Sequence, residues 1–201
     1  MCLFTYSLHP HLRSPEFFDD VQLTQAVKHC LDATPSLGDC SSGTYGAFKG
    51  WDVSRVDNMK GLFNNKAFFN ENIKKWNVGN VTSMEEMFLQ ATSFNGSIGK
   101  WDVSNVRNMR RMFAHAYAFN ADISGWVVGN VENMEKMFSN AISFNADISQ
   151  WNVSAVKNMA LMLRNATKFE IDLSEWDISE WTDVTGMLRD TKAAGMCGGC
   201  V

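Results

Sequence analysis

The chain has 201 residues, of which 45% are hydrophobic and 12% aromatic, which is enough apolar material for one buried core and argues against a disordered chain. A net charge of −4 with scattered Lys and Arg residues excludes a nucleic-acid surface, which needs clustered positive charge. No apolar run reaches the roughly 18 residues of a transmembrane helix, so membrane insertion is excluded, and the first residues lack the pattern of a signal peptide.

Residues 1–43 are expected to form a lead-in and an N-terminal cap. Pro10, Pro15 and the lack of periodicity favour a loosely ordered lead-in over residues 1–17. Asp19 or Asp20 can cap a helix that runs through residues 21–33 and covers the open end of the repeats described below. Its apolar stripe is expected from residues at helical spacing: Val21, Leu23 or Leu31, Ala26 and Val27.

The five cysteines all lie outside the repeats, and they do not form a dense disulfide framework. Cys30 and Cys40 can staple the N-terminal cap in an oxidising compartment. Cys197 and Cys200 form a lone CxxC, which leaves a local disulfide, a free thiol pair or an intermolecular link as alternatives. A zinc site normally needs a second pair, so we expect no metal and no cofactor.

The middle of the chain is organised by a tryptophan that recurs every 25 residues. Its members are Trp51, Trp76, Trp101, Trp126, Trp151 and Trp176. A fixed period of this length predicts a repeat solenoid, in which each unit stacks on its neighbours. We expect about five full repeats plus partial end repeats over residues 44–191, and a flexible tail rich in Cys and Gly over residues 192–201.

Counting each unit from its tryptophan as position 1, two segments are expected. Apolar residues recur at offsets 0, 3, 5 and 8 in each unit, for example at Ile98, Trp101, Val103 and Val106. This spacing predicts a short parallel strand centred on positions 25 to 3. The residues Met109, Met112, Phe113 and Ala116 have helical spacing. Position 8 holds good helix caps in every unit: Asn58, Ser83, Asn108, Asn133, Asn158 and Asp183. The predicted fold class is therefore an α/β repeat solenoid, leucine-rich-repeat-like, with an N-terminal helical cap.

The units WDVSNVRNMRRMFAHAYAFNADIS and WNVSAVKNMALMLRNATKFEIDLS resemble the repeats of the BspA-like, mycoplasma-type leucine-rich-repeat surface proteins. The resemblance extends from about Thr44 to Leu188. It implies an extracellular or cell-surface module for adhesion or protein binding, with no enzyme activity and no catalytic residues. The chain departs from the family pattern at Lys66, Val127 and Leu163.

Position 2 carries the candidate binding site, because solenoids of this kind usually bind through their sheet face and position 2 points outward. Its polar members are Asp52, Asn77, Asp102, Asn152 and Asp177, with Val127 interrupting. The row suits hydrogen bonding to a peptide, a glycan or a cation. The alternative is that these residues only solvate an exposed strand.

A second polar ladder occupies positions 20 and 22. It consists of Asn70, Asn95, Asn120 and Asn145 followed by Asp122, Asp147 and Asp172. Stacked Asn side chains can bond one another and the backbone of the turn. Calcium binding is the alternative, because carboxylates on adjacent turns can share a hard cation.

The expected function is a non-catalytic module that binds a protein or a glycan. No unit departs from the repeat with a distinct set of nucleophile, base or metal ligands, so an enzyme is not expected. A structural spacer or self-assembly module without a specific ligand is the alternative, with exposed repeat ends or tail cysteines linking chains.

Overall fold

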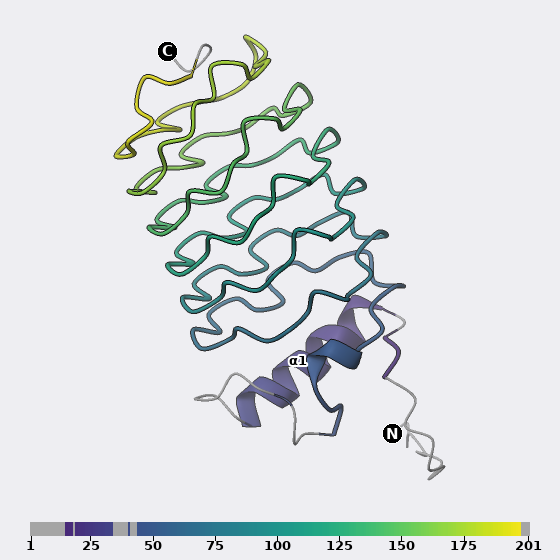
Figure 1. Cartoon of the computed structure of the whole chain (residues 1–201). Coiled ribbons are helices and arrows are strands. Elements are labelled where there is room, and N and C mark those ends of the chain that lie inside the picture. Colours follow the sequence, from purple (N-terminus) through teal and green to yellow (C-terminus); the bar gives the residue numbers. More distant parts are fainter. Residues whose placement is uncertain (1–14, 18, 34–39, 41–43, 198–201) are drawn as a thin grey trace.

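The computed structural model describes residues 15–17, 19–33, 40 and 44–197. Consecutive 25-residue units are wound into coils that stack along one axis, with α1 at the N-terminal end of the stack (Figure 1). Coils 1 to 6 begin at the six tryptophans of position 1. The lead-in expected over residues 1–17 and the tail cysteine Cys200 lie outside the described residues, apart from residues 15–17.

The expected N-terminal helix is α1, Asp20–Ala33, and Asp19 caps it by accepting a hydrogen bond from the Gln22 N–H at 2.7 Å. Its buried face is formed by Leu23, Ala26, Val27, Cys30 and Leu31. Val21, expected in this stripe, is instead 61% exposed. Lys66 of coil 1 donates to Asp32 at 2.8 Å, which ties α1 to the first coil, and a disulfide joins Cys30 of α1 to Cys40.

The predicted α/β architecture is wrong. Among the described residues the helices are α1 and the 3-10 helix η1, Phe48–Gly50, and the β-structure is limited to isolated parallel bridges. Five of these bridges join successive position-8 residues from Asn58 to Asp183. The chain therefore lacks the strand and helix per repeat of a leucine-rich-like solenoid.

Tight turns replace the predicted helix over positions 9 to 16. In coil 1 the N–H groups of Leu62, Asn64 and Lys66 each donate to the carbonyl three residues earlier, not four. Gly61 and Asn65, at positions 11 and 15, have φ of 63° and 59°, as the third residues of type II turns do. A left-handed residue cannot continue an α-helix, so this segment cannot be helical.

The remaining amides of this segment tie each coil to the next one. N–H groups at positions 9, 11, 13 and 15 donate to carbonyls at positions 8, 10, 12 and 14 of the following coil, with N···O distances of 2.7–3.0 Å through coils 1 to 5. Met59, for example, donates to the Ser83 carbonyl at 2.9 Å. Backbone pairing between coils therefore takes the place of a regular sheet.

The core of the stack is a set of side-chain columns. The phenylalanines of positions 13 and 19 stack within a coil, as Phe113 and Phe119 do at 3.8 Å between ring centroids. Phe113 also stacks on Phe138 of the next coil at 5.6 Å. Each position-1 tryptophan after Trp51 donates its indole N–H to the carbonyl 28 residues earlier; Trp126, for example, donates to the Ile98 carbonyl at 3.1 Å. Coils 1 to 4 thus repeat the same phenylalanine stack.

Candidate functional site

The position-2 side chains form an exposed row, one per coil along the stack. Its polar members, the residues expected to bind a ligand, are all exposed: Asp52, Asn77, Asp102, Asn152 and Asp177. Val127 interrupts the row and is 64% exposed. Because the coils contain no regular strand, this row is not a sheet face, and its regular spacing comes from the stacking of turns.

Local hydrogen bonds fix the side chains of this row. Asp102 Oδ1 accepts from the Ser104 N–H at 3.1 Å and from its hydroxyl at 2.6 Å, and Asn152 is held in the same way by Ser154. The hydroxyl and amide of Ser104 lower the pKa of Asp102, and the Ser54 amide lowers that of Asp52. The carboxylates of Asp52 and Asp102 are therefore charged and oriented, and Oδ1 is the acceptor in both.

At the N-terminal end of the row, the backbone N–H and carbonyl of Asp52 are already paired with other residues of the chain. Residues 15–17 lie beside Asp52, whose N–H donates to the Pro15 carbonyl at 2.9 Å and whose carbonyl accepts from Phe17 at 3.0 Å. A partner that follows the row along the stack therefore meets residues 15–17 at coil 1.

The Asn ladder of position 20 has a structural role. Asn70, Asn95 and Asn120 each accept, through Oδ1, a hydrogen bond from the backbone N–H of the residue 25 positions later, at 2.7–2.9 Å. At position 22, Asp122 and Asp147 bond the Ser two residues on. Within the described ranges, no three His, Cys, Asp or Glu side chains gather as metal ligands do.

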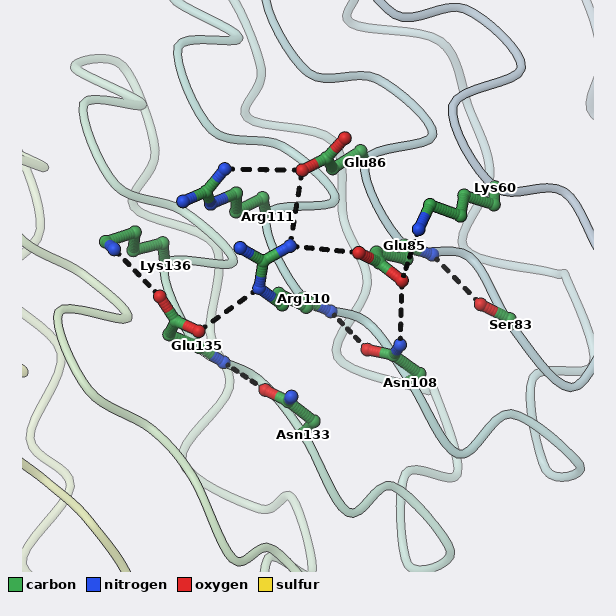
Figure 2. A network of polar contacts seen from close by, with 10 residues as sticks. All are labelled: Lys60, Ser83, Glu85, Glu86, Asn108, Arg110, Arg111, Asn133, Glu135 and Lys136. Atoms are coloured by element: carbon green, nitrogen blue, oxygen red, sulfur yellow. Dashed lines mark hydrogen bonds and ion pairs between the residues drawn. The ribbon is translucent and has the colours of Figure 1, made fainter.

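A network of charges crosses coils 1 to 4 at positions 10 and 11 (Figure 2). Arg110 lies at its centre and contacts Glu85 at 2.9 Å, Glu86 at 3.3 Å and Glu135 at 3.1 Å. Lys60 contacts Glu85 at 3.2 Å from the other side. Burial alone would raise the pKa of Glu85, but the hydrogen bonds from Lys60 and Arg110 outweigh it and lower that pKa. The network holds neighbouring coils together.

The position-8 residues belong to this network rather than to helix caps. Asn108 Oδ1 accepts from the Arg110 N–H at 3.0 Å, and its amide donates to Glu85 at 3.2 Å. The same bond to the amide two residues on recurs from Asn58 to Asp183. Position 8 thus satisfies the position-10 amide, which neither the turns nor the next coil pair.

Sequence reasoning missed the charge network and the left-handed residues of positions 11 and 15. Alternating signs at position 10, Lys60, Glu85, Arg110 and Glu135, were visible as a 25-residue pattern. The signal for the turns was also present, because position 11 is glycine in coils 1 and 6 and position 15 is mostly Asn, Asp or His, residues that tolerate positive φ.

Several open hollows adjoin the stack. One of about 780 Å³ is lined by Lys74, Lys75, Lys100 and Asp122 among others, and another of about 390 Å³ includes Arg107 and Trp181. No helix in the described part of the chain has the length and apolarity to cross a membrane.

Comparison with family models matches the chain twice, over residues 35–141 and 98–196, to the family described as "Mycoplasma protein of unknown function, DUF285". These matches span well over half of the chain. No curated protein and no solved structure matches it. The repeats of stacked turns are thus those of a mycoplasma-type family, and the chain belongs to the DUF285 family.

Proposed function

We propose that the chain is a non-catalytic binding module whose position-2 row contacts a protein or a glycan. The observation that carries this proposal is the row itself: polar side chains at one position of five coils, all exposed and mostly fixed by turns. An array oriented in advance loses little side-chain entropy when it binds, which favours affinity.

The same proposal places the chain among the BspA-like surface proteins, outside the cell. The disulfide between Cys30 and Cys40 supports an oxidising compartment, because disulfides persist mainly in extracytoplasmic proteins.

Charge reversal tests the row. The triple variant Asp52→Lys, Asp102→Lys and Asp177→Lys is compared with the natural chain in capture assays on immobilised extracellular-matrix proteins and mucin glycans. We expect capture to be lost, because three exposed carboxylates, two of them oriented by hydrogen bonds, become cations. The matched control is Asp122→Lys, Asp147→Lys and Asp172→Lys at position 22, where each Asp also accepts from the amide two residues on. Capture that survives in the position-2 variant, or is lost equally in both, rejects the row as the binding surface.

A further inference from the structure

Trp181 departs from the repeat in its exposure. Position 6 is a buried valine in coils 1 to 5, from Val56 to Val156, whereas Trp181 occupies it in coil 6 and is 85% exposed. The other six tryptophans are at most 5% exposed. Trp181 therefore does not take the core place that the valines of position 6 occupy.

A one-residue shift of the turn explains the exposure. In coil 5 the position-6 N–H of Val156 donates to the position-3 carbonyl of Val153 at 2.9 Å. In coil 6 the turn bond instead joins the Thr182 N–H to the Ser179 carbonyl at 3.0 Å, one position later. The shift turns position 6 from the core to the surface, and the Trp181 N–H is held by the Ser179 hydroxyl at 3.3 Å.

The indole borders the hollow of about 390 Å³, which is lined by both polar and apolar groups of residues at positions 4 to 7. Along position 7, Glu132 lies between Arg107, at 3.5 Å, and Lys157. The hydrogen bond from Lys157 keeps the pKa of Glu132 below its ordinary value. Asn130 donates its amide to the Ser104 carbonyl at 2.8 Å, which leaves its side-chain oxygen as an acceptor. Beside the indole, the hollow therefore offers both cationic donors and anionic or amide acceptors.

We propose that this hollow binds a hexopyranose residue of a neutral glycan, with the sugar ring stacked on Trp181 and its hydroxyls bonded to the position-7 row. A sugar presents an apolar C–H face and a rim of hydroxyls that both donate and accept, and the hollow offers the complement of each. This inference rests on the proposed binding function and names its ligand class.

The charged side chains that line the hollow argue against a protein partner and against a polyanion. The centre of a protein interface is depleted in charged residues, whereas Arg107, Glu132 and Lys157 line this hollow. Glu132 also offsets one of the two cations, which leaves a poor site for a polyanion.

Because Trp181 is the exposed one of the seven tryptophans, fluorescence quenching can test whether a sugar covers it. Acrylamide quenching of the full chain reports on Trp181, and the probes are cellohexaose, chitohexaose, laminarihexaose and mannohexaose at up to about 10 mM, enough to detect weak sites. We expect at least one of them to protect the indole from quenching. Trp181→Ala should weaken binding of that sugar about tenfold or more by calorimetry, since aromatic stacking is lost, and Trp181→Phe should retain part of it.

Tyr117→Ala is the matched control, because Tyr117 is another exposed aromatic residue and lies outside the hollow. The inference is overturned if none of the four sugars protects the indole, or if Trp181→Ala binds the sugar as the natural chain does. Loss of protein capture in Trp181→Ala without sugar binding would also overturn it, in favour of a protein partner. In each case the position-2 variants decide the proposed function separately.

Discussion

At the scale of single residues, the side chain at position 8 replaces a missing backbone partner. Asn108 accepts from the Arg110 amide and donates to Glu85, whereas Asp183 serves the equivalent amide of Thr185 with a carboxylate at 2.9 Å. Either Asn or Asp can therefore form the turn. The charge that faces position 8 from the preceding coil decides which of the two is tolerated.

This argument predicts opposite outcomes for one substitution in two coils. Asn108→Asp sets a carboxylate against Glu85 and should lower the free energy of unfolding by about 1–2 kcal/mol, because a hydrogen bond to a charged group becomes a repulsion. Asn133→Asp keeps the turn bond and faces the coil that holds Arg110, so it should change stability little. Urea denaturation measures both variants, and equal losses would show that the facing charge is irrelevant.

Left-handed backbone gives a second prediction for single residues. Gly61 is left-handed, with φ of 63°, whereas Gly125 is not in the left-handed region. At both glycines an added Cβ would meet no atom closer than 3.9 Å. Gly61→Ala should therefore cost about 1–2 kcal/mol from the left-handed conformation alone. Gly125→Ala should be neutral or slightly stabilising, because it restricts the unfolded chain. If thermal unfolding shows equal effects, backbone conformation is not the cause.

At the scale of the element, the coil shows how far the sequence could predict this fold. The apolar set Met109, Met112, Phe113 and Ala116 is fully buried, as a helical face would be. Successive turns bring residues at offsets 0, 3, 4 and 7 to one side just as a helix does, so apolar spacing alone cannot separate the two. What separates them is the sign of φ at Arg111 and His115, both left-handed here although neither is glycine.

The candidate site was predictable to a similar degree. Period and polarity placed Asp52 and Asp102 on an exposed row, and exposure is what the structure shows. The one-residue shift that exposes Trp181 depends on hydrogen bonds in the last coil, and the sequence records it only as a valine replaced by tryptophan. The sequence therefore shows the substitution but not the exposure of the indole.

The charge network between coils predicts a dependence of stability on pH. Hydrogen bonds from Lys136 and Arg110 lower the pKa of Glu135, and those from Lys60 and Arg110 lower that of Glu85, below the ordinary 4.5. Because the folded state lowers these pKa values, the stabilisation is complete above about pH 4.5 and is lost as pH falls through the folded-state values. Arg110→Met should flatten this acid slope and cost about 1–3 kcal/mol at neutral pH.

Arg107→Met is the matched control for the network. Arg107 pairs with Glu132 on the open surface, where its side chain is 65% exposed, so its loss should change stability by less than about 1 kcal/mol. Denaturant titrations at several pH values measure both variants. The network is not stabilising if Arg110→Met and Arg107→Met behave alike.

At the scale of the whole molecule, one set of backbone hydrogen bonds gives the stack a polarity, because all its members run in the same direction along the axis. The amides of positions 9, 11, 13 and 15 all donate toward the C-terminal end, and their carbonyl partners belong to the coil that follows. Within the described ranges, the last coil therefore ends in amides without a backbone acceptor, those of Val184, Gly186, Leu188 and Asp190.

Amide hydrogen exchange tests this polarity. The four terminal amides should exchange orders of magnitude faster than their equivalents in coil 4, Met134, Lys136, Phe138 and Asn140, which donate to coil 5 at 2.7–3.0 Å. Peptide-resolved mass spectrometry compares residues 184–190 with residues 134–140. Equal protection would mean that another group covers the C-terminal end.

The repeat also predicts what removal of one coil does. Deletion of residues 101–125 joins Lys100 to Trp126 in phase, so the tryptophan, phenylalanine and Asn columns can re-form, and the shorter chain should fold with a lower free energy of unfolding. The charges of position 10 do not re-form, because Glu85 now faces Glu135 without Arg110 between them. Two like charges raise each other's pKa, so this variant should gain stability as pH falls toward 4.5, opposite to the natural chain.

Adding Glu135→Arg to the deletion of residues 101–125 places a positive charge beside Glu85 again. This second variant should not gain stability as pH falls. Deletion of residues 126–150 is the control, since it places Ala160 beside Arg110 and brings no glutamates together at this position. Urea titrations between about pH 4 and 7 compare the three variants across the range where glutamates titrate. If the first deletion shows the acid response of the natural chain, the charges of neighbouring coils do not set their register, and the apolar columns alone hold the coils in phase.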